Sequence, residues 1–258
     1  MQVKTRKLDI FDGLELKSAV FQGQRFPAHF HDTYAVTILE KGCEWIDWQG
    51  QEIVQYAQTV SIINPFEVHS NRFFDQDEWH YKSFYINVDV LRFLLGQPVY
   101  FPRQLIEDAL FAQAILRLHK EAERTLSENS LSEILPFFRQ YGTGKQRSDP
   151  MPISDAMMDI AHVMQNFPDQ KWSVEDLAQR CGMDKFKFIR GFKQAHGITP
   201  VSYLLVHRIQ LAKKLMFSER SLTQVALDSG FYDQSHFIHC FRKHVGVAPN
   251  LYRANMGP

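Results

Sequence analysis

Three histidines and a glutamate stand in two short motifs of the N-terminal half. His29 and His31 end the pattern Gly-x5-His-x-His that begins at Gly23, and Glu67 and His69 belong to Pro-x-Glu-x-His. Imidazole nitrogens and carboxylate oxygens are ligands for zinc or iron, and they also bind polar groups of organic molecules. The residue types therefore leave three interpretations open: a metal site, contacts to an organic effector, and histidines bonded within the fold.

The C-terminal part contains an internal repeat of a helix, a tight turn and a second helix. Ser173 and Ser221 are placed to cap the first helix of each copy. A glycine then ends that helix, and Asp184 or Asp233 caps the next one. The residues that recur are, in the first copy, Val174, Leu177, Ala178, Gly182, Asp184, Phe188, Phe192, Gly197, Pro200 and Tyr203 and, in the second, Leu222, Val225, Ala226, Gly230, Asp233, Phe237, Phe241, Gly246, Pro249 and Tyr252.

The second helix of each copy has an outward face that can donate hydrogen bonds. At 100° per residue, Arg190 lies opposite the inward phenylalanines of the first copy, and His239 lies opposite those of the second. An arginine there can bind O6 and N7 of guanine in the major groove, and Phe186 can pack on a thymine methyl group. An ordinary solvated helix face is the alternative. The other residues on or near these faces are Ile189, Gln234, Ser235 and His236.

A longer helix is predicted between the copies, from Pro200 to Phe217, with Thr199 before it. Its apolar stripe would pack on both units and fix their spacing. Cations off that stripe are candidate phosphate ligands, which set register without reading sequence. Arg208 is the first choice, and the others are Lys213, Lys214 and, on the second recognition helix, Lys243.

Residues 153–253 resemble the DNA-binding domain of AraC/XylS-type transcription regulators. The resemblance rests on Ala226, Gly230, Phe231, Ser235, Phe237, Phe241, Gly246, Pro249, Tyr252 and Arg253, each at the family's spacing. It implies a seven-helix domain whose two recognition helices enter successive major grooves, roughly 34 Å apart. Gly191 and Asp184 depart from the family's pattern. The base contacts that the family implies are Lys185, Phe186, Ile189, Arg190, Gln234, Ser235, His236 and His239.

The N-terminal half is predicted to be an antiparallel β-barrel followed by helices at 103–123 and 130–141. Four runs between Tyr34 and Val88, TYAVTIL, EWIDW, TVSIIN and WHYKSFYINV, alternate apolar and polar residues between turn signals. The two histidine motifs resemble those of cupins, but the expected glutamate after His31 is replaced by Ala35 or Val36. We therefore expect no metal and no cofactor. The candidate effector-binding residues are His29, His31, Tyr34, Glu67, His69, Trp79 and Tyr81.

Charge and composition fit an α+β chain of two domains. Residues 145–258 carry 15 Lys and Arg against 10 Asp and Glu, whereas residues 1–144 carry 14 against 19. We place a cupin-like effector-binding and dimerisation domain at 1–144, a linker at 145–152, and an all-α DNA-binding domain with two helix-turn-helix units at 153–258. No stretch of 18 apolar residues and no secretory signal is seen, which favours a cytoplasmic protein without membrane contact.

These observations predict an effector-responsive, sequence-specific transcription regulator that is not an enzyme. Its expected partners are double-stranded promoter DNA, a small-molecule effector, a second copy of the chain and, as a further candidate, RNA polymerase. Two alternatives remain. One is a metal-dependent cupin enzyme fused to a DNA-binding module, and the other is a ligand-independent dimeric activator.

Overall fold

The computed structural model describes residues 2–8, 14–73, 78–122, 128–144 and 155–256. The chain forms two compact units, one of residues 1–25 and 30–148 and one of residues 149–258 together with residues 26–29. The first is rich in antiparallel sheet and the second is helical, which confirms the predicted fold class. The predicted linker, 145–152, lies outside the described residues.

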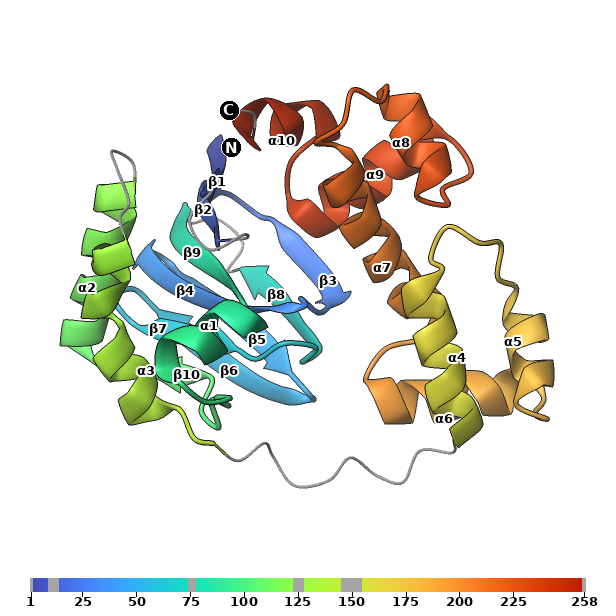
Figure 1. Cartoon of the computed structure of the whole chain (residues 1–258), viewed down its shortest axis with the longest axis horizontal. Coiled ribbons are helices and arrows are strands. Elements are labelled where there is room, and N and C mark those ends of the chain that lie inside the picture. The colour runs from blue at the N-terminus through green and yellow to red at the C-terminus, as the bar shows by residue number, and fades with distance from the viewer. Residues whose placement is uncertain (1, 9–13, 74–77, 123–127, 145–154, 257–258) are drawn as a thin grey trace. The chain divides into compact units, whose positions relative to one another are not determined.

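Two antiparallel sheets make up most of the first unit (Figure 1). The six-stranded sheet has the order β1 (Gln2–Leu8), β2 (Leu14–Phe21), β9 (Trp79–Asn87), β4 (Thr33–Lys41), β7 (Val60–Ile63) and β10 (Leu105–Ile106). The four-stranded sheet has the order β3 (Arg25–His29), β8 (His69–Phe73), β5 (Cys43–Trp48) and β6 (Gln51–Tyr56). The four predicted runs lie in β4, β5, β7 and β9. The strands before Tyr34, together with β6, β8 and β10, were not predicted.

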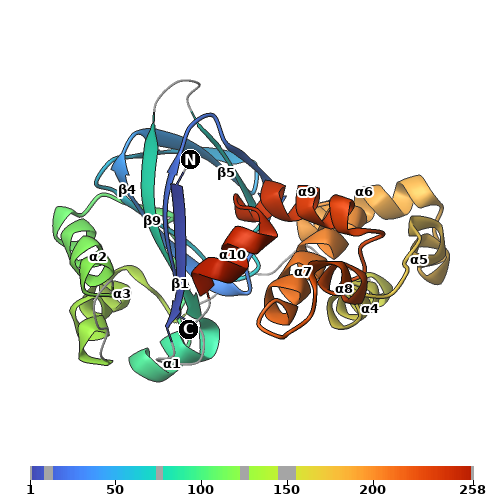
Figure 2. The same cartoon turned by 90° about the horizontal axis from the view of Figure 1, so that it is seen from above.

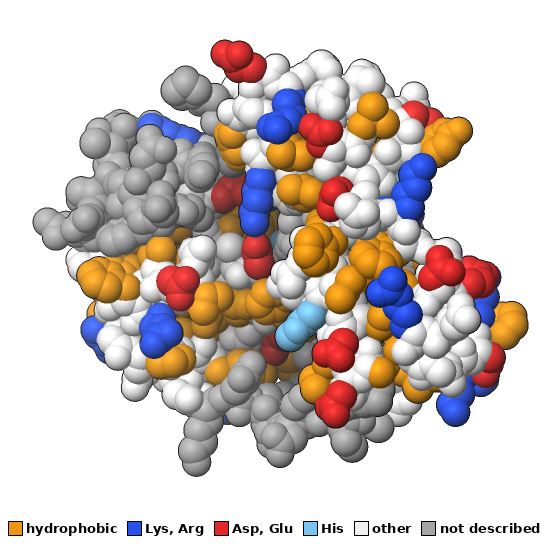
Figure 3. Space-filling view, turned by 45° about the vertical axis from the view of Figure 1, so that its right-hand side comes forward, with side chains coloured by type: hydrophobic (Ala, Val, Ile, Leu, Met, Phe, Trp, Pro, Cys, Tyr) orange, Lys and Arg blue, Asp and Glu red, His pale blue; other side chains and the backbone are white. Residues whose placement is uncertain are grey.

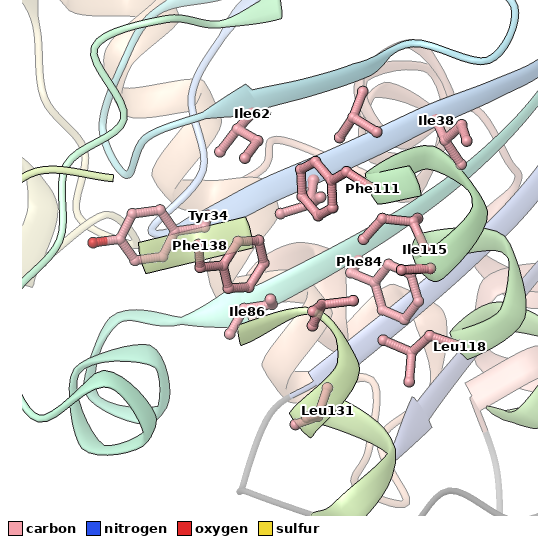
Figure 4. Close-up of a cluster of buried hydrophobic side chains, with 14 of the residues drawn as sticks. Tyr34, Ile38, Ile62, Phe84, Ile86, Phe111, Ile115, Leu118, Leu131 and Phe138 are labelled. Carbon is pink, nitrogen blue, oxygen red and sulfur yellow. The ribbon is translucent and has the colours of Figure 1, made fainter. Parts of the chain in front are cut away.

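Helices cover one face of the six-stranded sheet. They are α1 (Val88–Leu95), α2 (Ala109–Ala122) and α3 (Leu135–Tyr141), and α2 and α3 lie together on that face in Figures 1 and 2. Successive side chains of a strand point to opposite faces of the sheet, so each strand places its apolar side chains on the face that the helices cover. The core they form includes Leu16 and Val36 from the sheet. Figure 4 labels further members, among them Ile62 and Phe84 from the sheet and Phe111, Ile115, Leu118 and Phe138 from the helices. The apolar stripe of α2 therefore packs on the sheet.

Helix α2 begins later in the chain than the sequence pattern indicated. Leu105, which lies inside the predicted helix 103–123, pairs with Ser61 as part of β10. Asp108 accepts hydrogen bonds from the backbone N–H groups of Leu110 and Phe111, at 2.9 and 3.1 Å, and so caps α2. The prediction of a helix from residue 103 is therefore wrong by about two turns, because a capping aspartate was not weighed against a short apolar run.

Seven helices form the second unit within residues 155–256. They are α4 (Asp155–Asn166), α5 (Val174–Arg180), α6 (Lys185–His196), α7 (Pro200–Leu215), α8 (Leu222–Asp228), α9 (Gln234–Val245) and α10 (Pro249–Met256). The pairs α5–α6 and α8–α9 are the two helix-turn-helix units, and α7 runs between them (Figure 1). The predicted caps are all present: Ser173, Asp184, Thr199, Ser221 and Asp233 each accept a backbone N–H of the helix that follows.

The two turn glycines have the same backbone conformation in different surroundings. Gly182 has φ +62° and Gly230 has φ +85°, a region that side chains with a Cβ rarely adopt. A Cβ on Gly182 would meet nothing within 4 Å. On Gly230 it would lie 2.8 Å from Nε of Arg208 and 2.9 Å from the backbone of Pro168 and Asp169. The second turn is thus pressed against the loop between α4 and α5.

Gly230→Ala is expected to lower the free energy of unfolding by at least about 3 kcal/mol, because a left-handed backbone and a steric clash act together. Gly182→Ala is the matched control, with an expected loss of about 1 kcal/mol from the backbone alone. Urea denaturation of both variants measures the difference. Equal losses would show that the turn of the second unit is not tightly packed.

Candidate functional sites

One side of the first recognition helix, α6, packs on the rest of the unit, and the opposite side is exposed. Phe188 and Phe192 are fully buried, and the Asp184 carboxylate accepts the N–H groups of Phe186 and Lys187 at 3.0 and 2.9 Å. On the other side Arg190 is exposed and Phe186 is 72 % exposed. Ile189 and Gly191 are half-buried. A Cβ on Gly191 would lie 2.6 Å from the methyl carbon of Met157, so this glycine allows α4 to pack closely on α6.

The second recognition helix, α9, repeats this arrangement. Phe237 and Phe241 are fully buried, and Asp233 accepts the N–H of His236 at 2.7 Å. Ser235, His236 and His239 are exposed. The ring of His236 also contacts the ring of Phe231, with centroids 5.5 Å apart. Arg190 of α6 and His239 of α9, at equivalent positions, thus both present polar side chains to solvent.

Two of the predicted base contacts already have partners inside the unit. Lys185 forms an ion pair with Glu175 of α5. Gln234 accepts a hydrogen bond from the hydroxyl of Thr223 at 2.6 Å. Neither bond was foreseen, and each ties the first turn of a recognition helix to the helix before it. One exposed aromatic residue was also missed: Tyr232, next to the Asp233 cap, is 88 % exposed.

The basic side chains of α7 have different surroundings. Arg208 is half-buried, and its guanidinium donates to the carbonyl oxygens of Pro168 and Gln170 at 2.8 and 2.9 Å. These bonds give Arg208 a structural role in place of the predicted phosphate contact. Lys213 is half-buried with its Nζ 5.3 Å from the ring centroid of Tyr252, whereas Lys214 is exposed.

The surface in Figure 3 has no large patch of one charge that would identify a DNA-binding interface by itself. Acidic and basic side chains are interspersed there with apolar ones, in keeping with a formal net charge of zero. Lys243 on α9 is exposed and remains a candidate phosphate ligand.

The histidines of the two sequence motifs come together in one cluster. One ring nitrogen each of His29, His31 and His69 lies within 4.8 Å of the others. His29 and His69 are buried and His31 is half-buried. Burial lowers the pKa of His69 to about 4, against the opposing effect of its bond to the Glu67 carbonyl oxygen, so this ring is neutral near pH 7.

Glu67 lies two residues before His69 in the sequence, but its carboxylate is engaged elsewhere. Oε2 accepts hydrogen bonds from Nε1 of Trp48 at 3.0 Å and from the backbone and side-chain nitrogens of Asn64 at 3.2 and 3.1 Å. Oε1 accepts the hydroxyl of Tyr100 at 3.0 Å. Glu67 therefore holds the loop before β8 in place.

Tyr34 is not brought to the histidines. It lies on the helix-covered face of the sheet, in the apolar core, and its hydroxyl donates to the carbonyl oxygen of Val99 at 2.6 Å. Strand parity explains the difference, because a residue one position away points to the opposite face. Tyr34 is thus a core residue in place of the predicted effector contact.

The other face of the six-stranded sheet carries a continuous row of polar side chains, which we call the polar row: Thr5, Lys17, Ser83, Thr37 and Ser61. Cross-strand pairing aligns them over β1, β2, β9, β4 and β7. All are buried except Thr37, which is half-buried, and its hydroxyl lies 2.7 Å from that of Ser83. A dry sheet-to-sheet core would be apolar at these positions.

Two more buried polar residues come from the four-stranded sheet, where Glu44 and Gln55 pair across β5 and β6. Asn71 donates to Glu44 at 2.9 Å, yet burial still raises the pKa of Glu44 to about 7. Gln55 donates from Nε2 to the carbonyl oxygens of Thr37 and Thr59, at 3.1 and 2.9 Å, while its buried Oε1 has no protein partner among the described residues.

Aromatic rings adjoin these polar groups. Trp79 and Tyr81 are buried with ring centroids 4.2 Å apart, and Nζ of Lys17 lies 5.5 Å from the Tyr81 centroid. Burial, reinforced by the charges of Tyr85, Glu44 and Glu15, raises the pKa of Tyr81 well above its usual value. Of the predicted effector contacts, Trp79 and Tyr81 are therefore next to the polar row. Sequence reasoning missed Lys17, Glu44 and Gln55, although each stands at an inward position of its strand.

Glu44→Gln is expected to remove a pH-dependent loss of stability. Because the folded pKa of Glu44 is about 7 and the unfolded one about 4.5, the wild-type chain loses stability as pH rises from about 4.5 to 7, by at most about 3 kcal/mol. The measurement is the melting temperature of both proteins at pH 5 and pH 8, with Glu121→Gln on the exposed side of α2 as control. If the melting temperature changed by the same amount between pH 5 and pH 8 in the wild type and in Glu44→Gln, the result would contradict a buried, protonated Glu44.

Comparison with known proteins covers both units. Residues 13–137 match the family model of the AraC-like ligand binding domain, and residues 177–255 match that of a helix-turn-helix domain. The HTH-type transcriptional regulator YbfI of Bacillus subtilis is 27 % identical over 92 % of this chain and 90 % of its own length. The HTH-type transcriptional activator RhaS of Escherichia fergusonii is 28 % identical over 97 % of this chain and 96 % of its own.

Among known structures, unsaturated fatty acid-bound ToxT from Vibrio cholerae has the same two-domain fold, with a TM-score of 0.59 and 17 % identity over 94 % of this chain and 95 % of that one. No described helix has the length and apolarity needed to cross a membrane. The ligand-binding and helix-turn-helix matches lie in the order that the two units have in the structure. The chain therefore belongs to the AraC-type transcriptional regulators, with an N-terminal ligand-binding domain and a C-terminal helix-turn-helix DNA-binding domain.

Proposed function

We propose that α6 and α9 enter two successive major grooves of one DNA duplex and read bases with their exposed faces. The observation that carries this is the equivalence of the helices: each is capped by an aspartate, seated on two buried phenylalanines, and open to solvent at Arg190 or His239. The proposed base contacts are Lys185, Phe186, Ile189, Arg190, Gln234, Ser235, His236 and His239, with Lys213, Lys214 and Lys243 toward phosphates.

We further propose that a polar small molecule binds between the sheets of the first unit as the effector. The polar row, with Glu44 and Gln55 opposite, supplies a buried amine, hydroxyls, a carboxyl group and an amide oxygen without a protein partner among the described residues. A buried amide oxygen is costly to leave without a hydrogen bond, so Oε1 of Gln55 favours a ligand between the sheets. ToxT has been seen with an unsaturated fatty acid. The charged and hydroxyl groups here favour a compound with several hydrogen-bonding groups, stacked against Trp79 and Tyr81.

In this proposal the effector changes how two DNA-binding domains of a dimer are held, and RNA polymerase is the partner at the promoter. The domain limits are 1–144 and 153–258 with a linker between them, and the site of action is the cytoplasm. Relatives named as regulators support a regulator over an enzyme. The bonds of Glu67 to Trp48, Asn64 and Tyr100 give the same support, since they engage the one carboxylate of the two histidine motifs.

Arg190→Ala is expected to weaken binding to the selected operator by about 1 to 3 kcal/mol and to relax specificity at one base position. Lys214→Ala should instead weaken binding to all DNA sequences alike. It should also reduce the slope of log affinity against log salt concentration by about one. Fluorescence anisotropy with operator and single-base variants at several salt concentrations separates the two. Unchanged affinity and specificity in Arg190→Ala would reject its role in base reading.

Arg208→Ala is expected to lower the free energy of unfolding by about 2 kcal/mol, since two charge-assisted bonds to backbone carbonyls are lost. The slope of log affinity against log salt should stay at the wild-type value. A slope reduced by about one, as expected for Lys214→Ala, would restore the phosphate role that the sequence indicated.

A further inference from the structure

Each recognition helix begins with a side chain that is bonded to the helix before it. In the first unit the ammonium of Lys185 pairs with the carboxylate of Glu175, and in the second the hydroxyl of Thr223 donates to Oε1 of Gln234 at 2.6 Å. Glu175 and Thr223 are the second residues of α5 and α8, whereas Lys185 and Gln234 are the first residues of α6 and α9. The two units thus form an equivalent contact with different chemistry, an ion pair in one and a neutral hydrogen bond in the other.

Burial does not require either bond. Glu175, Lys185 and Thr223 are exposed and Gln234 is half-buried, so water can satisfy these polar groups where the bonds are absent. An exposed ion pair stabilises a folded chain very little, because holding two long side chains in one geometry costs conformational entropy. The contact lies beside the first turn of each recognition helix, and the N-terminal residues of such a helix contact base edges. Its presence in both units therefore indicates a role on DNA.

The bond from Thr223 fixes which end of the Gln234 amide carries the acceptor. A glutamine side chain can turn about its last bond and so exchange the places of its oxygen and its NH₂ group. With Oε1 held by the hydroxyl, the amide keeps one orientation, in which Nε2 is left to donate and Oε1 keeps a second lone pair. A donor beside an acceptor is the arrangement that binds N7 and N6 of adenine in the major groove.

We propose that Thr223 is a positioning residue for base reading, which holds the Gln234 amide in the orientation that binds adenine. Thr223 acts through Gln234 and itself contacts no base. The pair of Glu175 with Lys185 supports this role, because it ties the equivalent side chain of the first unit in the same place. The inference rests on the proposed function, in which Gln234 contacts a base, and adds the residue of α8 that determines which base is preferred.

The test measures the base preference of the full-length chain on the operator that it selects from random DNA, with each position changed in turn. The position that Gln234 reads is the one whose preference Gln234→Ala removes, and we expect an adenine there. Thr223→Val removes the hydroxyl and keeps the branched shape, so discrimination at this position should fall by about fivefold. Thr223→Ser keeps the hydroxyl and should retain the wild-type preference.

Gln224→Ala is the matched control. Gln224 is the exposed neighbour of Thr223, and its side chain donates to Asp228 of the same helix at 2.7 Å. This variant also loses one surface hydrogen bond of α8, but one that does not reach the recognition helix, so its base preference should equal that of the wild type. Melting temperatures of all variants show whether each is folded.

A double-variant cycle separates positioning from direct contact. In a Gln234→Ala chain, adding Thr223→Val should not change affinity further, because the amide that Thr223 orients is gone. A further loss would overturn the proposal, since Thr223 would then bind DNA itself. Equal losses of preference in Thr223→Ser and Thr223→Val, or a preferred base other than adenine, would also overturn it.

Failure of this inference is distinguishable from failure of the proposed function. If Gln234→Ala changed the preference at one position and Thr223→Val did not, the positioning role would be rejected and the base contact of Gln234 would stand. If Gln234→Ala changed the preference at no position, the base contact and the positioning role would both be rejected.

Discussion

Everything that the second unit can do on DNA depends on the fixed separation of its two recognition helices. Helix α7 lies between the helix-turn-helix units and packs on both of them. Arg208 adds hydrogen bonds from α7 to the loop between α4 and α5, and Gly230 lets the turn of the second unit approach that same loop. Helix α7, the loop between α4 and α5 and the turn of the second unit thus meet at one place, and this contact holds the two recognition helices at a fixed separation.

The first unit depends on a different constraint, the alternation of a sheet with two buried faces. On one face Leu16, Phe84, Val36 and Ile62 lie side by side and pack under α2 and α3. One residue along each strand, the polar row faces the opposite sheet. The same strands therefore build a conventional apolar core on one face and a polar interior on the other.

Local chemistry made much of this architecture predictable. The caps at Asp184 and Asp233, the turn glycines and the buried phenylalanines follow from the sequence because each acts within one helix or turn. Contacts between distant segments did not follow. Arg208 reaches carbonyls some forty residues away, and Tyr34 faces the core because of strand parity, which depends on a register that no local pattern specified. Leu105 was assigned to a helix for the same reason, since its partner Ser61 is far away in sequence.

The most direct test of the fixed separation is the dependence of affinity on the spacing of half-sites. An operator selected from random DNA should contain two half-sites about one helical turn apart. Inserting about 5 base pairs between them turns one half-site to the opposite side of the duplex, so affinity should fall to that of a single half-site, and a full-turn insertion should not restore it, because α7 cannot lengthen. Equal affinity at every spacing would contradict the account, since it would mean that the two helices do not act as one rigid reader.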